Sequence, residues 1–159
     1  MENPRMTATP ETRHTYAGTF THSVDAKGRV TIPAAWRLTD SESGQYLALP
    51  ISGENPHILV LPPWKIRDLR EELTVGDQKG NQKLARKMAT IFSKGESLKI
   101  DENGRFVLSS RLLKNAGISK KASFVGCLLD FQIWNPDAYA TFDGEGALSE
   151  SDVEDLRYL

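Results

Sequence analysis

The sequence predicts a mainly β protein with attached helices (α+β), built as a pseudo-symmetric pair around a β-barrel core. The first observation behind this prediction is an internal repeat, since residues 25–38 read DAKGRVTIPAAWRL and residues 101–113 read DENGRFVLSSRLL. The second is that each copy is followed by an apolar strand with a Pro and a Trp at its end, in residues 57–64 and 130–137. Units this short cannot bury their own apolar faces, so the two copies are expected to close one core together.

The first copy begins with period-2 alternation from Tyr16, which places Phe20, His22 and Val24 on one face of a strand. Residues 26–28 then predict a turn, with glycine where a positive φ is least costly. The return strand carries Val30 and Ile32 inward, Pro33 ends it, and residues 34–38 suit one or two helical turns. Residues 40–56 are rich in Ser, Gly, Asp and Glu and predict a variable loop.

Between the copies, apolar residues at helical spacing predict helices over residues 64–73 and 78–92. The second helix is expected to expose four basic side chains, Lys79, Lys83, Arg86 and Lys87. In the second copy, Leu98 and Ile100 are expected to face inward, and Asn103–Gly104 is a strong hairpin turn. The elements expected after that turn are a return strand with Phe106 and Leu108 inward, a helix over 111–116 ended by Gly117, strands over 122–129 and 131–134, and a helix over 136–142.

Composition excludes several classes of protein. No apolar stretch of the 159 residues is long enough to cross a bilayer, and residues 1–15 lack the apolar core of a signal peptide, so a cytoplasmic location is expected. The single cysteine, Cys127, excludes an intrachain disulfide and is expected to be a small core residue because it lies in an apolar run. His14, His22 and His57 have no metal-ligand spacing, and no nucleophile or phosphate-binding motif is present, so neither catalysis, a cofactor nor a small-molecule substrate is expected.

Charge is segregated along the chain. Residues 143–159 hold six acids and one base, whereas the remaining residues hold 19 bases and 15 acids. The folded body is therefore mildly basic, which permits but does not require binding to a polyanion.

Taken together, the DxKGRxxIPxxxR string over residues 25–37, its weaker copy, the Pro63 and Trp134 positions and the strand 123–126 resemble the MraZ family of bacterial transcription regulators. The resemblance covers about residues 16–142. It implies two AbrB-like swapped-hairpin units in one chain. It also implies a nucleoid-associated protein that binds double-stranded DNA at the promoter of the cell-division and cell-wall gene cluster, usually as a repressor, and assembles into a ring, here expected to be an octamer or larger.

On this resemblance the family's D-x-x-x-R string falls on Asp25 and Arg29, with Lys27 in the turn between them. The second copy keeps Asp101 and Arg105 but replaces the lysine with Asn103. It also has Ser109, Leu113 and Val107 in place of Pro33, Arg37 and Thr31. The candidate DNA-binding residues are thus Asp25, Lys27, Arg29, Arg37 and Arg105.

Chemistry independently supports these residues. A two-stranded ribbon fits the major groove, arginine can donate two hydrogen bonds to guanine, and lysine offers a point charge to phosphate. Asp25 is expected to aim Arg29 through an ion pair across the turn rather than to touch DNA. The plainer alternatives are a surface ion pair at Asp25 and Arg29, a helix-capping role for Arg37, and a protein-covered face at Arg105 beside Val107. Trp36, Trp64 and Trp134 are expected in the core or at a subunit interface rather than as base-stacking platforms.

These observations divide the chain into a leader (1–15), a first AbrB-like repeat (16–66), a helical connector (67–94), a second repeat (95–142) and an acidic tail (143–159). The tail suits a short amphipathic helix from Ser149, which would dock on a neighbouring subunit or compete with DNA. A disordered solubilising tail is the alternative. The alternative function is an antitoxin-like protein-binding module of the AbrB type, against which the internal duplication argues.

Overall fold

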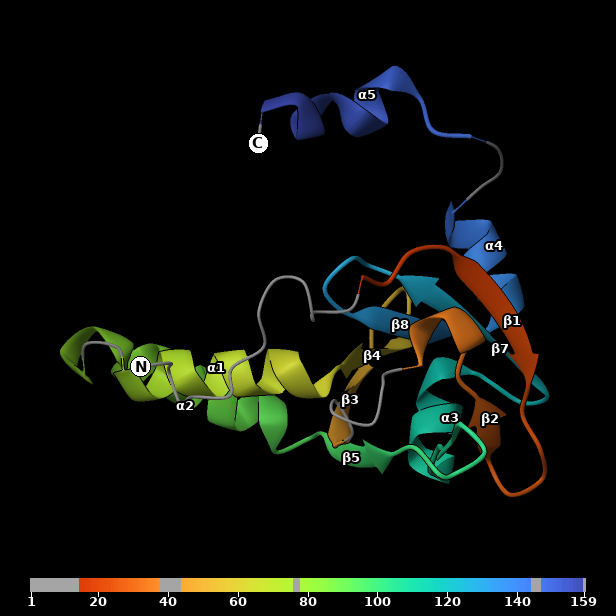
Figure 1. Ribbon diagram of the computed structural model, residues 1–159, viewed down its shortest axis with the longest axis horizontal. Helices are drawn as coiled ribbons and strands as arrows, with labels where there is room; N and C mark the ends of the chain where they lie inside the picture. The colour runs from red at the N-terminus through yellow and green to blue at the C-terminus, as the bar shows by residue number, and fades with distance from the viewer. Residues whose placement is uncertain (1–14, 38–43, 76–77, 144–146, 159) are drawn as a thin grey trace, which may run out of the picture.

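The computed structural model describes residues 15–37, 44–75, 78–143 and 147–158, and its strands form two antiparallel sheets (Figure 1). The larger sheet is open, with its strands hydrogen-bonded in the order β1 (Thr19–Ser23), β7 (Lys121–Gly126), β8 (Phe131–Trp134), β4 (His57–Leu61), β3 (Gln45–Ile51) and β5 (Glu96–Lys99). The smaller sheet pairs β2 (Arg29–Thr31) with β6 (Arg105–Val107). The predicted fold class, mainly β with attached helices, is confirmed.

The two copies exchange strands. Alignment of the repeats matches β1 with β5, β2 with β6, β3 with β7 and β4 with β8, so the order of the larger sheet is unchanged when the copies are swapped. Strand β1 of the first copy pairs with β7 of the second, with Phe20 opposite Phe124. In return, β5 of the second copy pairs with β3 of the first, with Tyr46 opposite Leu98. Each copy therefore completes the sheet of the other. This is expected because each copy is too short to bury its own apolar face.

The strands that flank each turn do not form the simple hairpin that the turn residues predict. After the first turn, β1 and β2 share a single bridge, Val24 to Val30, and then belong to different sheets. Strand β2 instead pairs with β6, with Val30 opposite Phe106. This crossing places both inner side chains at the centre of the molecule, where more apolar surface is removed from water than a local hairpin could remove.

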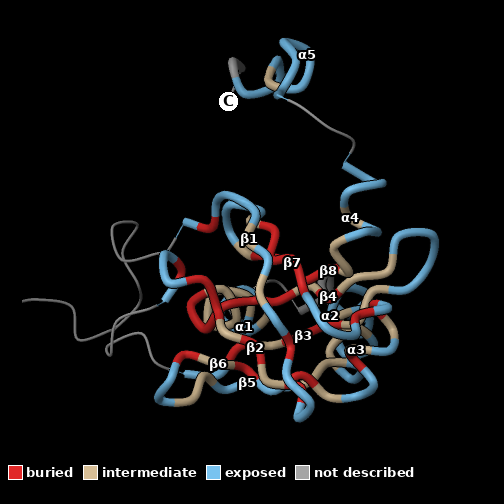
Figure 2. Tube along the Cα trace, turned by 90° about the vertical axis from the view of Figure 1, so that its right-hand side faces the viewer, coloured by how far each residue is buried: buried red, intermediate tan, exposed pale blue. Residues whose placement is uncertain are grey.

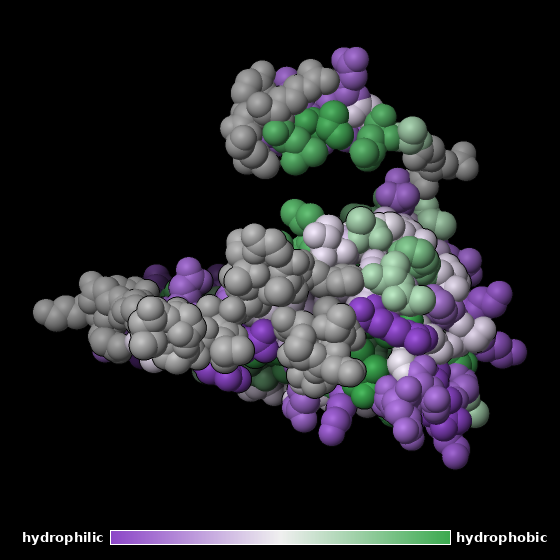
Figure 3. Space-filling model, viewed as in Figure 1, coloured by the Kyte–Doolittle hydropathy of each residue, from purple (hydrophilic) through white to green (hydrophobic). Residues whose placement is uncertain are grey.

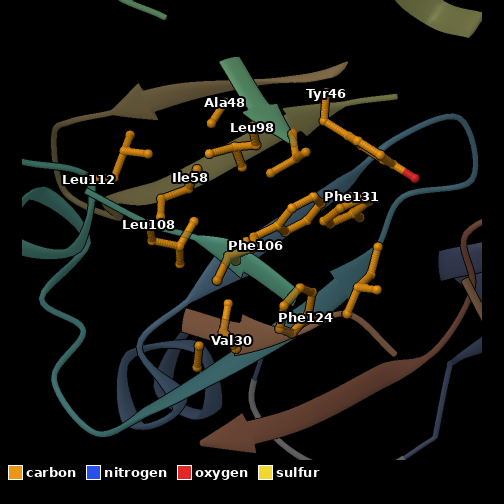
Figure 4. Packing of buried hydrophobic residues seen from close by; sticks show 14 of the residues in the cluster. Val30, Tyr46, Ala48, Ile58, Leu98, Phe106, Leu108, Leu112, Phe124 and Phe131 are labelled. Carbon is orange, nitrogen blue, oxygen red and sulfur yellow. The ribbon is translucent and has the colours of Figure 1, made fainter. Parts of the chain in front are cut away.

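The core lies between the two sheets (Figure 4). Val30 and Phe106 point from the ribbon of β2 and β6 into the same cluster as Phe124 and Phe131 of the larger sheet. Phe106, Phe124 and Phe131 are fully buried. The three tryptophans, Trp36, Trp64 and Trp134, are 1%, 2% and 2% exposed, which confirms that they are structural rather than base-stacking residues.

The helices also follow the sequence closely. They are η1 (Ala34–Trp36), α1 (Pro63–Val75), α2 (Gln78–Phe92), α3 (Ser110–Ala116), α4 (Pro136–Asp143), α5 (Glu150–Val153) and η3 (Glu154–Tyr158). Helix α3 begins where the Ser109 hydroxyl accepts from the backbone N–H of Leu112, and ends at Gly117, whose φ is +67°. Among the helices of the described ranges, none is long and apolar enough to cross a membrane.

Three further sequence expectations are wrong, namely the loop over residues 40–56, the strand end at Leu129 and the core position of Cys127. The loop predicted over residues 40–56 contains β3, because Tyr46, Ala48 and Leu49 are buried although the residues around the strand are polar. The strand predicted to run to Leu129 ends at Gly126, and Cys127 is exposed rather than in the core. Residues 127–129 turn outward after Gly126 packs against the Tyr16 backbone, and Leu128 has a φ of +73°. The predicted leader lies outside the described residues, apart from Thr15.

Candidate nucleic-acid interface

The first turn is organised by Asp25. One of its carboxylate oxygens accepts from the backbone N–H groups of Lys27 and Arg29, at 2.9 and 2.8 Å. The other accepts from Nε of the Arg29 side chain at 2.6 Å. This is the ion pair that the sequence predicts, and it fixes both the turn and the direction of the guanidinium. The two terminal nitrogens have no acceptor among the described residues, and the side chain is 35% exposed, so this end of the guanidinium is available to an external acceptor.

The second turn repeats this arrangement. Asp101 accepts from the backbone N–H groups of Asn103 and Arg105 at 2.8 and 2.9 Å, and from Nε of Arg105 at 3.0 Å. The Arg105 side chain is 29% exposed, against 35% for Arg29. The second copy therefore holds its arginine by the same geometry as the first, even though the turn has lost the lysine.

These hydrogen bonds favour the ionised carboxylates. Donation by the Arg29 backbone N–H, followed by its side chain, lowers the pKa of Asp25 from the usual 3.8. The backbone N–H of Arg105 does the same for the pKa of Asp101, partly opposed by desolvation. Both aspartates therefore hold their arginines as full anions at neutral pH.

The two turns are tied to one another through their glycines. The carbonyl of Gly28 accepts from the N–H of Leu108 at 2.8 Å, and the carbonyl of Gly104 accepts from the N–H of Ile32 at 2.9 Å. Gly28 and Gly104 have φ values of +81° and +74°, which other residues rarely adopt. Each turn is thus anchored on the strand end of the other copy, so the two arginines have a fixed spatial relation.

The outer face of the ribbon carries both arginines. Arg29 lies opposite Val107 and Thr31 lies opposite Arg105, while Val30 and Phe106 face the core. The two arginines are therefore diagonal neighbours on one face, a relation that separates backbone positions by about 7–8 Å. Val107 is 55% exposed, whereas the Arg29 and Arg105 side chains are 35% and 29% exposed, so within the described chain this face is open at Val107 and partly covered at the two arginines.

Arg37 reaches across to the second turn. Its backbone N–H closes the short helix η1 on the carbonyl of Ala34, so the main chain makes the cap that was the alternative role of the side chain. Its guanidinium lies against Gly104, close enough that a Cβ on that glycine would meet Cζ at 2.7 Å. The first turn therefore has Lys27 beside Arg29, and the second has Arg37 beside Arg105. The repeat pattern could not reveal that Arg37 lies where the second turn lacks a lysine, because Arg37 reaches that turn only through the exchange of strands between the copies.

Of the five predicted residues, Asp25, Lys27 and Arg29 share one turn, while Arg105 belongs to the other turn and the Arg37 guanidinium lies against its Gly104. Thr31, which is not among the predicted residues, lies on the same outer face opposite Arg105, and its outward position in the alternation was the available signal. Figure 3 shows hydrophilic side chains gathered over the edge of the body that carries β2 and α3. Within the described ranges no cluster of His, Cys, Asp or Glu could hold a metal ion.

Comparison with known proteins gives a consistent result. Residues 91–157 match the family model described as "MraZ protein, putative antitoxin-like", which spans the second repeat and the tail. A relative from Idiomarina loihiensis named "Transcriptional regulator MraZ" is 30% identical over 142 residues, covering 87% of this chain and 89% of its own length. Relatives of the same name from Pseudomonas fluorescens and Pseudomonas aeruginosa are 32% and 30% identical, over 78% and 89% of this chain and 82% and 90% of their own.

Proposed function

The chain belongs to the MraZ family of transcriptional regulators, and on that premise we propose that it binds double-stranded DNA through the outer face of β2 and β6. The observation that carries this proposal is the pair of outward guanidinium forks, Arg29 and Arg105, each fixed by an aspartate. A two-stranded ribbon fits the major groove, which is about 12 Å wide, and diagonal arginines about 7–8 Å apart both lie within that width.

The roles of the residues follow from their geometry. Arg29 and Arg105 donate through their terminal nitrogens to the O6 and N7 of guanines, which is the commonest specific contact of arginine with DNA. Asp25 and Asp101 position these forks without touching DNA. Lys27 and Arg37 lie beside the two arginines and contact phosphates, which fix the register of the ribbon on the duplex.

A single chain offers too few cations to bind tightly at physiological salt, because each phosphate contact is weakened as counterions compete. We propose that the protein forms a ring, which presents several identical ribbons and raises the effective concentration of each further contact. Neighbouring subunits would then read direct repeats in the promoter of the division and cell-wall gene cluster, and occupancy of that promoter would repress it.

The test is salt-dependent binding of the wild type and Arg29→Ala to the DNA upstream of the chain's own gene. Loss of a bidentate contact costs about 1–3 kcal/mol, so specific affinity per site should fall roughly 5- to 150-fold. Arg67→Ala removes an arginine on α1, outside both turns, and is the matched control, expected to keep specific binding. Equal binding by the wild type and Arg29→Ala, at unchanged oligomer mass, would remove the turn from the interface.

The second candidate is an antitoxin-like protein-binding module, which the description of the matching family model favours. A pull-down that recovers a stoichiometric protein toxin, from a chain without affinity for DNA, would support this function over DNA binding.

A further inference from the structure

An apolar groove lies where helices α1 and α2 leave the body as an arm (Figure 1). It has a volume of about 280 Å³ and is lined by Leu47 of β3, by Ile66, Leu69, Arg70 and Leu73 of α1, and by Phe92 at the end of α2. All six lining residues are at least partly exposed, so the groove is open to solvent. An open groove with five apolar residues is typical of a surface that another segment covers.

The C-terminal segment, residues 148–156, presents a matching apolar surface. Its helix is preformed by a capping box, in which the Ser149 hydroxyl accepts from the N–H of Asp152 and the Asp152 carboxylate accepts from the N–H of Ser149. Leu148 and Leu156 are 76% and 65% exposed. Figures 1 and 2 show the segment set apart from the body, and Figure 3 shows hydrophobic side chains gathered along it. Val153 and Leu156, three residues apart, share one face of the segment.

The two surfaces have opposite charge. The segment carries only acids over residues 149–156, namely Glu150, Asp152, Glu154 and Asp155. The groove contains Arg70, although helix α1 as a whole balances three bases with three acids. The positive charge comes from the adjoining helix α2, which has no acidic residue and exposes Lys83, Arg86 and Lys87. Such complementarity steers association and fixes its orientation.

We propose that the groove receives the C-terminal segment of a second copy of this chain, with Val153 and Leu156 inserted between Leu69, Leu73 and Phe92. An apolar cavity of about 150 Å³ holds one benzene-sized group, so this groove has room for both side chains. The segment follows α4, on the side of the body opposite the arm, and is set apart from the body, which leaves it available to a neighbouring groove (Figure 1). Because tail and groove are different surfaces, the contact is head-to-tail and can close a ring.

The inference rests on the proposed assembly, and cross-linking tests it directly. Two full-length variants are mixed, Leu73→Cys with one tag and Leu156→Cys with another, both carrying Cys127→Ser to remove the exposed native thiol. Mild oxidation should give a disulfide-linked heterodimer, since the two residues would lie within disulfide range. Ser151→Cys, on another face of the same segment, is the control and should link to Leu73→Cys far less.

Two results would overturn the proposal. If a chain that carries both cysteines forms the disulfide only within itself, the segment lies in its own groove. If no disulfide forms, either in that chain or between the mixed variants, the docking is excluded. Leu156→Asp, which alters only an exposed side chain, should in addition lower the oligomer mass. Arg29→Ala should weaken specific DNA binding while the heterodimer still forms, so failure of the DNA interface and failure of this contact are distinguishable.

Discussion

Alanine at the two turn glycines should have unequal effects, because the structure places different neighbours beside them. At Gly28 a Cβ would run into the backbone carbonyl of Leu108, which cannot move without shifting β6. At Gly104 a Cβ would meet the end of the Arg37 side chain, which can swing away. Both variants must also hold a left-handed backbone, at about 1–2 kcal/mol each.

The magnitudes follow from these contacts. Gly104→Ala should cost about 1–2 kcal/mol, from the backbone conformation alone. Gly28→Ala should also weaken the hydrogen bond from the Leu108 N–H to the Gly28 carbonyl, which adds about 0.5–1.5 kcal/mol and brings the total to about 1.5–3.5 kcal/mol. With a urea m-value of about 2 kcal/mol/M, the midpoint should fall by about 0.8–1.8 M for Gly28→Ala and about 0.5–1 M for Gly104→Ala.

The assay is urea unfolding of both variants at one fixed protein concentration, because assembly makes stability concentration-dependent. DNA binding of Gly104→Ala, measured in parallel, should fall because Arg37 is displaced from the second turn. If Gly104→Ala is as destabilising as Gly28→Ala, or more so, the difference between a backbone and a side-chain neighbour does not govern these turns and the reasoning is refuted.

Three further predictions concern side chains of the turns and the exposed thiol. Asp25→Asn should weaken DNA binding nearly as much as Arg29→Ala, because an amide cannot accept from both the backbone and Nε of Arg29; wild-type affinity by fluorescence anisotropy would contradict this. The pKa values of Asp25 and Asp101 are lower in the folded protein than the usual 3.8. Their contribution to stability is therefore complete above pH 3.8 and is lost as the pH falls through the pKa values of the folded state. Thermal unfolding of the double Asn variant should accordingly show less acid sensitivity than the wild type. Cys127 should react with a maleimide in the native protein, more readily as the pH rises past the usual thiol range because desolvation raises its pKa, and reaction only after unfolding would show that it is buried.

Local chemistry made much of the site predictable from the sequence. The Asp25 to Arg29 contact spans four residues, and the geometry of a tight turn brings any such pair together. The alternation that put Val30 inward and Arg29 outward is likewise a property of the strand itself. The same local logic failed at Cys127, where an apolar composition was taken as burial although the chain turns outward after Gly126.

By itself, the sequence determined that two copies share one core, which residues form each turn, and which side chains face out, because these depend on neighbours a few positions apart. Only the tertiary structure decided that β2 pairs with β6, that both arginines share one face, and that Arg37 serves the turn of the other copy. These relations join residues more than 60 positions apart, and they arise because burying Val30 against Phe106 removes more apolar surface than a local hairpin would. No pattern along the chain encodes this difference in buried apolar surface. The difference depends on two complete folds, one with β2 paired to β6 and one with a local hairpin.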